Sequence, residues 1–204
     1  MNKETALNII INSFKTYNQE FVNKNVLFVF REKTGNIKGF ETTYEAGNFK
    51  HLTGVESQHG GENFYTLLDR GQLSIDDFSL NPDGTTVKKL FVIHMLKDII
   101  YSPYTIGYAR PHLLKNNSVK IDIATGNSKK LTIGYRYSSH PITLLNMNPG
   151  DAVIDKYTVL FTLIKENHEG KYKKVAYWKD GTSKNTLKKI ESPFKNQIDF
   201  SSIK

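Results

Sequence analysis

The hydrophobic spacing of this chain changes early from a helical to a strand-like period, and this change limits the folds open to it. Residues 4–22 carry apolar side chains at spacings of three and four, which predicts an amphipathic helix. These side chains are Leu7, Ile10, Phe14, Tyr17 and Phe21. Residues 26–30 then form a continuous apolar run rich in β-formers, which is typical of a buried strand. Helix followed by strand favours an α+β fold.

The half of the chain between residues 104 and 178 is predicted to be β-rich. Apolar and polar residues alternate over 119–123 and again over 131–137, with a Gly126-Asn127 turn between them, which indicates a hairpin. Residues 156–165 and 173–178 indicate a second hairpin, and Pro141 marks an edge or the start of a new strand. We therefore expect N-terminal helices packed on a mostly antiparallel sheet.

Shorter helices are expected over 62–70, 73–78, 85–101 and 183–190. The last dozen residues look polar, so 183–204 is interpreted as a basic C-terminal tail. Since no linker, repeat or change in composition marks a boundary, the prediction is one domain over 1–204. A break near residue 102 is the alternative.

Composition excludes several classes of protein. Cysteine is absent, so disulfide scaffolds, thiolate metal sites and thiol nucleophiles are ruled out. No apolar run approaches the ~20 residues that span a bilayer, and no signal-peptide cleavage site follows the first helix. The expectation is a soluble cytoplasmic protein without a membrane partner. The formal charge of +8 attracts polyanions, although solubility alone would also account for it.

Histidines are the candidates for proton-transfer chemistry. The chain has no P-loop, dinucleotide fingerprint, zinc-protease motif or nucleophile elbow. Six histidines are present without clustered carboxylates, so we expect neither a metal nor a cofactor. His51 and His140 stand at predicted element boundaries, where a side chain can be presented to a ligand. A structural hydrogen bond is the alternative for each of them.

The segment Phe49-Lys50-His51-Leu52-Thr53-Gly54 is the most distinctive in the chain. With the preceding strand at residues 28–32, it resembles the phage-encoded Barnase–EndoU–Colicin–RelE-like nucleases (the BECR fold), in the branch with a Phe-x-His-Leu-Thr-Gly signature. The resemblance covers roughly residues 20–165. Weaker agreement comes from residues 63–65, 73–78, 83–90, 131–134 and 141–145.

This resemblance implies a metal-independent endoribonuclease, a hydrolase found in phages and mobile elements and often acting as a toxin. RNA, either single-stranded or tRNA, would be its substrate, and a cognate inhibitor protein is an expected partner. Branches of the family differ in their catalytic residues: a carboxylate with a histidine, two histidines with a lysine, or basic residues with tyrosine. Only His51 and Thr53 can be carried over from the signature itself.

Cleavage of RNA by its own 2′-hydroxyl needs a base, an acid and a cation at the phosphorane. We expect His51 and His140 to act as base and acid in either order. Lys89 or Arg136 would stabilise the phosphorane charge.

Other residues are expected to bind the substrate through hydrogen bonds, charge or stacking: Lys50, Thr53, Tyr65, Tyr135 and Arg136. Each has a structural alternative. Lys89 could be a solvated helix residue, Tyr65 a core residue and Thr53 a turn cap.

Two other functions stay open at this point. One is a catalytically inactive nuclease-fold protein that recognises nucleic acid or a host protein. The other is an enzyme acting on a small molecule or on a protein.

Overall fold

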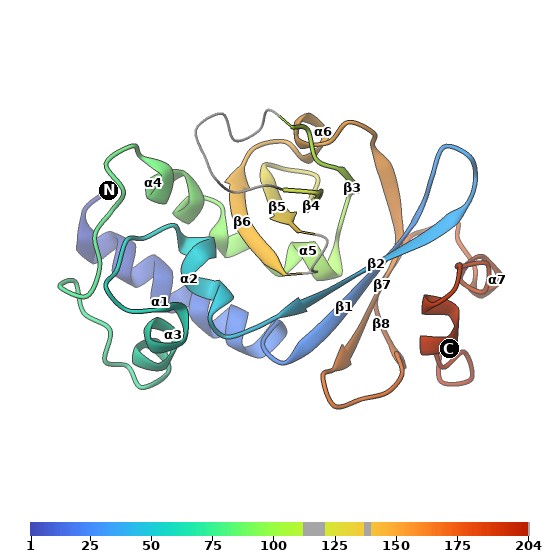
Figure 1. Ribbon diagram of the computed structural model, residues 1–204, viewed down its shortest axis with the longest axis horizontal. Helices are drawn as coiled ribbons and strands as arrows, with labels where there is room; N and C mark the ends of the chain where they lie inside the picture. Colours follow the sequence, from blue (N-terminus) through green and yellow to red (C-terminus); the bar gives the residue numbers. More distant parts are fainter. Residues whose placement is uncertain (112–120, 137–139, 204) are drawn as a thin grey trace.

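The computed structural model describes residues 1–111, 121–136 and 140–203. In this part of the chain, helices precede and flank a curled antiparallel sheet of eight strands (Figure 1). The predicted α+β class, with N-terminal helices on an antiparallel sheet, is confirmed. The elements are α1 (Lys3–Glu20), β1 (Lys24–Arg31), β2 (Ile37–Tyr44), α2 (Asn48–Thr53), α3 (Gly61–Asp69), α4 (Thr85–Leu90), η1 (Ile93–Met95), α5 (Asp98–Tyr101), β3 (Thr105–Tyr108), β4 (Ile123–Gly126), β5 (Leu131–Tyr135), β6 (Pro141–Asn146), α6 (Pro149–Ala152), β7 (Tyr157–Glu166), β8 (Lys174–Trp178), α7 (Lys184–Leu187) and η2 (Phe194–Gln197).

Strand β1 is buried on both faces, which explains its uninterrupted apolar run. The strand order is β2-β1-β7-β3-β4-β5-β6, with β8 also pairing with β7. Val26, Phe28 and Phe30 face the larger apolar cluster, which includes residues of α1 and α2. Leu27 and Val29 face a second cluster, formed with residues of the C-terminal segment. One strand thereby serves two apolar layers.

The N-terminal helix packs through aromatic rings. Tyr17 and Phe21 stack at 5.6 Å between ring centroids, and Phe21 meets Tyr44 of β2 edge-on at 4.8 Å. Phe14 and Tyr17 both contact Phe49 of α2. These rings fix α2 between α1 and the sheet.

The curl of the sheet brings its two ends together. Strands β2 and β6 lie at opposite ends of the strand order, yet they are in contact, and α2 packs on β6 (Figure 1). The hydroxyl groups of Tyr44 on β2 and Tyr135 on β5 are hydrogen-bonded at 2.8 Å across this closure. Both rings are fully buried.

Two predicted helices differ from the structure. The helix expected over 85–101 is divided into α4, η1 and α5. Its buried residues, which include Val92, Ile93, Leu96, Ile99 and Ile100, keep the spacing of one helical face, so their pattern does not mark the interruptions. Residues 73–78 form turns, because Asp77 accepts hydrogen bonds from both the main-chain amide and the hydroxyl of Ser74.

The C-terminal segment is packed against the sheet and is not a free polar tail. Ile190, Ile198 and Ile203 are buried with Leu27 and Tyr172 in the second cluster. The isoleucines are too far apart in the sequence to produce a periodic pattern, which is why composition suggested a tail. Within the described residues, no helix combines the length and apolar character that crossing a bilayer requires.

Candidate active site

The signature segment folds as helix α2 and ends at a left-handed residue. Phe49 and Leu52 are fully buried and anchor the helix, so that His51 faces outward. Gly54 follows with a φ of 70°, and its amide donates to the carbonyl of Lys50. Glycine adopts this conformation without the steric cost that a Cβ brings.

Gly54 also makes room for a neighbouring lysine. A Cβ at this position would lie 2.5 Å from Cδ of Lys89 on α4. The stem of Lys89 therefore crosses directly over the end of α2, and its ammonium group donates a hydrogen bond of 2.8 Å to the main-chain oxygen of His51. A side chain at this position would have to displace the flexible stem of Lys89.

The environments of His51 and Lys89 both disfavour their protonated forms. Partial loss of hydration lowers the pKa of His51, and the charges of Lys89 and Lys50 lower it further. Burial lowers the pKa of Lys89 to about 8, against the opposing effect of Asp83. At neutral pH the imidazole is thus available to accept a proton beside a lysine that is still largely charged. Perturbed groups of this kind cluster at functional sites.

Lys50 and Thr53 have main-chain partners in this structure. The ammonium group of Lys50 donates to the carbonyls of Ser57 and His59, which holds the loop after α2. Thr53 is fully buried, and its hydroxyl donates to the carbonyl of Lys50 at 2.7 Å. Both residues shape the surface on which His51 stands.

His140 lies immediately before β6, with Nδ1 at 3.4 Å from the carbonyl oxygen of Thr43. Helices α2 and α4, which carry His51 and Lys89, both pack on β6. His140 precedes this strand, and its hydrogen-bond partner belongs to β2. Arg136 is exposed just after β5, whereas Tyr135 beside it is fully buried. These two neighbours therefore point to opposite sides, as successive residues of a strand do.

The structure places two tyrosines away from this surface. Tyr65 on α3 donates to Oδ1 of Asn18 and packs edge-on against Phe14, so it joins α3 to α1. Tyr135 packs edge-on against Phe40 and is bonded to Tyr44, and burial raises its pKa well above the usual value. Its hydroxyl faces the core.

A histidine–carboxylate pair was missed by sequence reasoning. Nε2 of His59 lies 3.0 Å from Oδ1 of Asp77, and hydrogen bonds from Ser74, and then from His59, lower the pKa of that carboxyl. The two residues are 18 positions apart in irregular segments, so no spacing rule could pair them.

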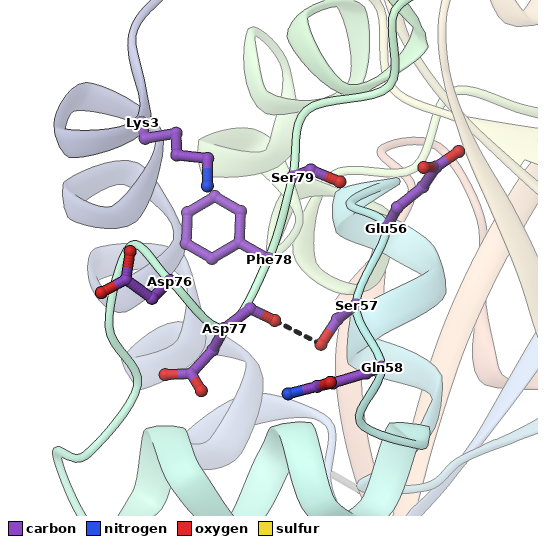
Figure 2. Close-up of a pocket in the computed structure, with 8 residues that line it drawn as sticks. All are labelled: Lys3, Glu56, Ser57, Gln58, Asp76, Asp77, Phe78 and Ser79. Carbon is purple, nitrogen blue, oxygen red and sulfur yellow. Dashed lines mark hydrogen bonds between the residues drawn. The ribbon is translucent and has the colours of Figure 1, made fainter.

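A depression of about 430 Å³ lies beside Asp77 (Figure 2). Its lining includes the carboxylates of Glu56, Asp76 and Asp77, with Lys3 at one side. The hydroxyl of Ser57 donates to the main-chain oxygen of Asp77, which closes one wall. Three carboxylates would repel a phosphodiester, so the surface around His51, with its two lysines, fits such a ligand better. No three His, Asp or Glu side chains of the described ranges are grouped to hold a metal ion.

Comparison with known proteins identifies one family. The family model described as phage-Barnase-EndoU-ColicinE5/D-RelE like nuclease4 matches residues 9–196. The match includes α2 and α4 and extends through η2, nearly the whole chain. No curated protein and no solved structure matches the sequence.

Proposed function

Since this chain belongs to the phage-Barnase-EndoU-ColicinE5/D-RelE like nucleases, we propose that it is a metal-independent endoribonuclease acting through His51. The observation that carries this proposal is the pairing of His51, whose pKa is lowered, with Lys89 on one surface of the family's fold. Membership of a nuclease family does not favour the alternative of a catalytically inactive binding protein.

In the proposed reaction, the neutral imidazole of His51 removes the proton of a ribose 2′-hydroxyl. The oxygen attacks the adjacent phosphorus, and the bond to the departing 5′-oxygen breaks as that oxygen gains a proton from His140. The products are a 2′,3′-cyclic phosphate and a free 5′-hydroxyl. Lys89, with Arg136 as the further candidate, stabilises the negative charge on the phosphorane.

The test is cleavage of RNA by purified parent and His51→Ala proteins. A general acid–base residue contributes roughly 10²–10⁴ in rate, so His51→Ala should slow cleavage by about that factor. His168→Ala is the matched control, since His168 is exposed in the β7–β8 connection. Circular dichroism checks that each variant is folded. Parent-like cleavage by His51→Ala would overturn the assignment.

The chemistry of the substrate gives an independent check. Replacing the ribose at the cleaved position by 2′-deoxyribose should abolish cleavage, because the internal nucleophile is gone. Cleavage of that substrate, or of DNA, would contradict the 2′-hydroxyl mechanism. A toxin role further predicts that expression of the parent arrests bacterial growth and that His51→Ala relieves the arrest, with RNA as the cellular target and an inhibitor protein as the protecting partner.

A further inference from the structure

Three adjoining depressions form a groove between the end of α4 and the start of β7. Their volumes are about 580, 630 and 290 Å³. The first two share Ser128 and Asn148, and the last two share a set of residues around β7, so the three are continuous. That shared set is Lys156, Tyr157, Thr158 and Lys179. We call this feature the basic groove.

The basic groove is rich in cations. Its lining includes six basic side chains, which are Arg31, Lys33, Lys129, Lys130, Lys156 and Lys179. Two carboxylates, Glu32 and Asp151, also line it, and Lys33 is bonded to Asp155 just outside. The surplus of positive charge suits a polyanion, and a groove focuses that charge along one track.

Two of the most exposed aromatic rings of the described chain lie in this groove. Phe91 is 68% exposed in its first part, and Tyr104 is 61% exposed in its middle part. Single exposed apolar residues need no explanation, but rings set among lysines form the combination that binds single strands. The bases stack on the rings while the phosphates meet the cations.

Lys156 is given room by a glycine. A Cβ at Gly150 would lie 2.6 Å from both Cε and Nζ of Lys156. The ammonium group therefore lies against Gly150 of α6, in the middle part of the groove. Because Gly150 has no side chain, the backbone of α6 leaves space for this cation in the groove lining.

We propose that the basic groove binds a single-stranded polynucleotide, with phosphates at Lys129, Lys156 and Lys179 and bases stacked on Phe91 and Tyr104. A duplex is a poorer fit because its bases are not free to stack on side chains. The inference rests on the proposed function in taking this strand to be the substrate. Phe91 caps the end of α4, the helix that carries Lys89, so the groove begins at an element of the candidate active site.

Binding can be measured separately from cleavage. The probe is a fluorescein-labelled 2′-O-methyl oligonucleotide of mixed sequence and roughly 12 nucleotides, within the site sizes of single-strand binders. Its methylated 2′-oxygen cannot act as a nucleophile. By fluorescence anisotropy, Tyr104→Ala should weaken binding about tenfold, and Tyr104→Phe should bind like the parent. The double variant Lys156→Gln/Lys179→Gln should make the slope of log K against log salt concentration shallower by about 1.4, because two phosphate contacts are lost.

The double variant Lys171→Gln/Lys173→Gln is the matched control. It removes the same charge from exposed positions between β7 and β8, at the opposite end of β7 from Lys156. Equal weakening by both double variants, or parent-like binding by the groove variants, would overturn the proposal. So would failure of the parent to bind the probe, which would leave the groove as a surface for an acidic protein.

The two proposals fail in distinguishable ways. If the groove variants lose the probe while the parent does not cleave RNA, the groove stands and the endoribonuclease proposal falls. If His51→Ala abolishes cleavage while the groove variants bind the probe like the parent, the endoribonuclease proposal stands and the groove falls.

Discussion

His51 and Lys89 set opposite limits on the pH range of the proposed reaction. A base must be deprotonated, so the rate of RNA cleavage should rise as the pH passes the lowered pKa of His51, below its usual 6.5. A cation must keep its proton, so the rate should fall as the pH passes about 8, where Lys89 loses its proton and its charge. The proposed acid, His140, must also hold a proton, so it limits the same side of the profile. We expect a bell-shaped profile of kcat/KM for the parent protein.

The variant Lys89→Arg tests whether Lys89 causes the alkaline limb of that profile. A guanidinium group stays protonated throughout the accessible range, so the fall near pH 8 should disappear or move well upward. The acid limb, which belongs to His51, should stay in place. An alkaline limb unchanged in Lys89→Arg would mean that another group controls it.

At the scale of elements, the junction of α2 and α4 depends on Gly54. Gly54→Ala would place a Cβ at a positive φ and against the stem of Lys89. We expect the free energy of unfolding to fall by about 1–2 kcal/mol from the backbone conformation alone, and RNA cleavage to slow as Lys89 is displaced. Urea denaturation and cleavage assays measure the two effects.

Gly60→Ala is the control for this change. Gly60 lies at the other end of the same loop, with a φ of −59° and open space around it. Since Gly60 is the N-cap of α3, where alanine is less favoured, its substitution should lower stability slightly and by less than Gly54→Ala does. If Gly54→Ala behaved in the same way, the junction would not depend on a left-handed residue.

The elements also show where sequence patterns are sufficient. The α1 helix was predicted from apolar residues at helical spacing, and the β1 strand from a short continuous apolar run. The division of 85–101 into α4, η1 and α5 was not predicted, because its buried side chains keep the spacing of one continuous helix. Local hydrophobic patterns predict which residues are buried more reliably than they predict where the chain changes direction.

At the scale of the whole molecule, the C-terminal segment forms part of the second apolar layer. Ile198→Ala should lower the free energy of unfolding by about 2–4 kcal/mol, because it leaves a cavity beside Tyr172 and Leu27. Ile154→Ala, at a position 56% exposed, should change it by less than about 0.5 kcal/mol. Equal urea midpoints for the two variants would mean that the segment does not stabilise the fold.

Some candidate functional groupings join residues that are far apart in the sequence, so the sequence alone could not predict them. His51 was proposed from a contiguous signature, and Lys89 from the predicted helix that carries it. The pairing of His59 with Asp77, and the basic groove, join residues from separate turns and strands. Lys129, Lys156 and Lys179 are about 25 positions apart and form no basic cluster in the sequence. The folded chain brings such residues together from segments that are distant in the sequence.

Because β1 belongs to both apolar layers, the two layers cannot come apart independently. A partly open form that loses either layer exposes one whole side of residues 26–30 to water. Such forms are costly, so the molecule should open as one cooperative unit around this strand. The amide protons of β1 and of its partner β7 should be the last to exchange with deuterium.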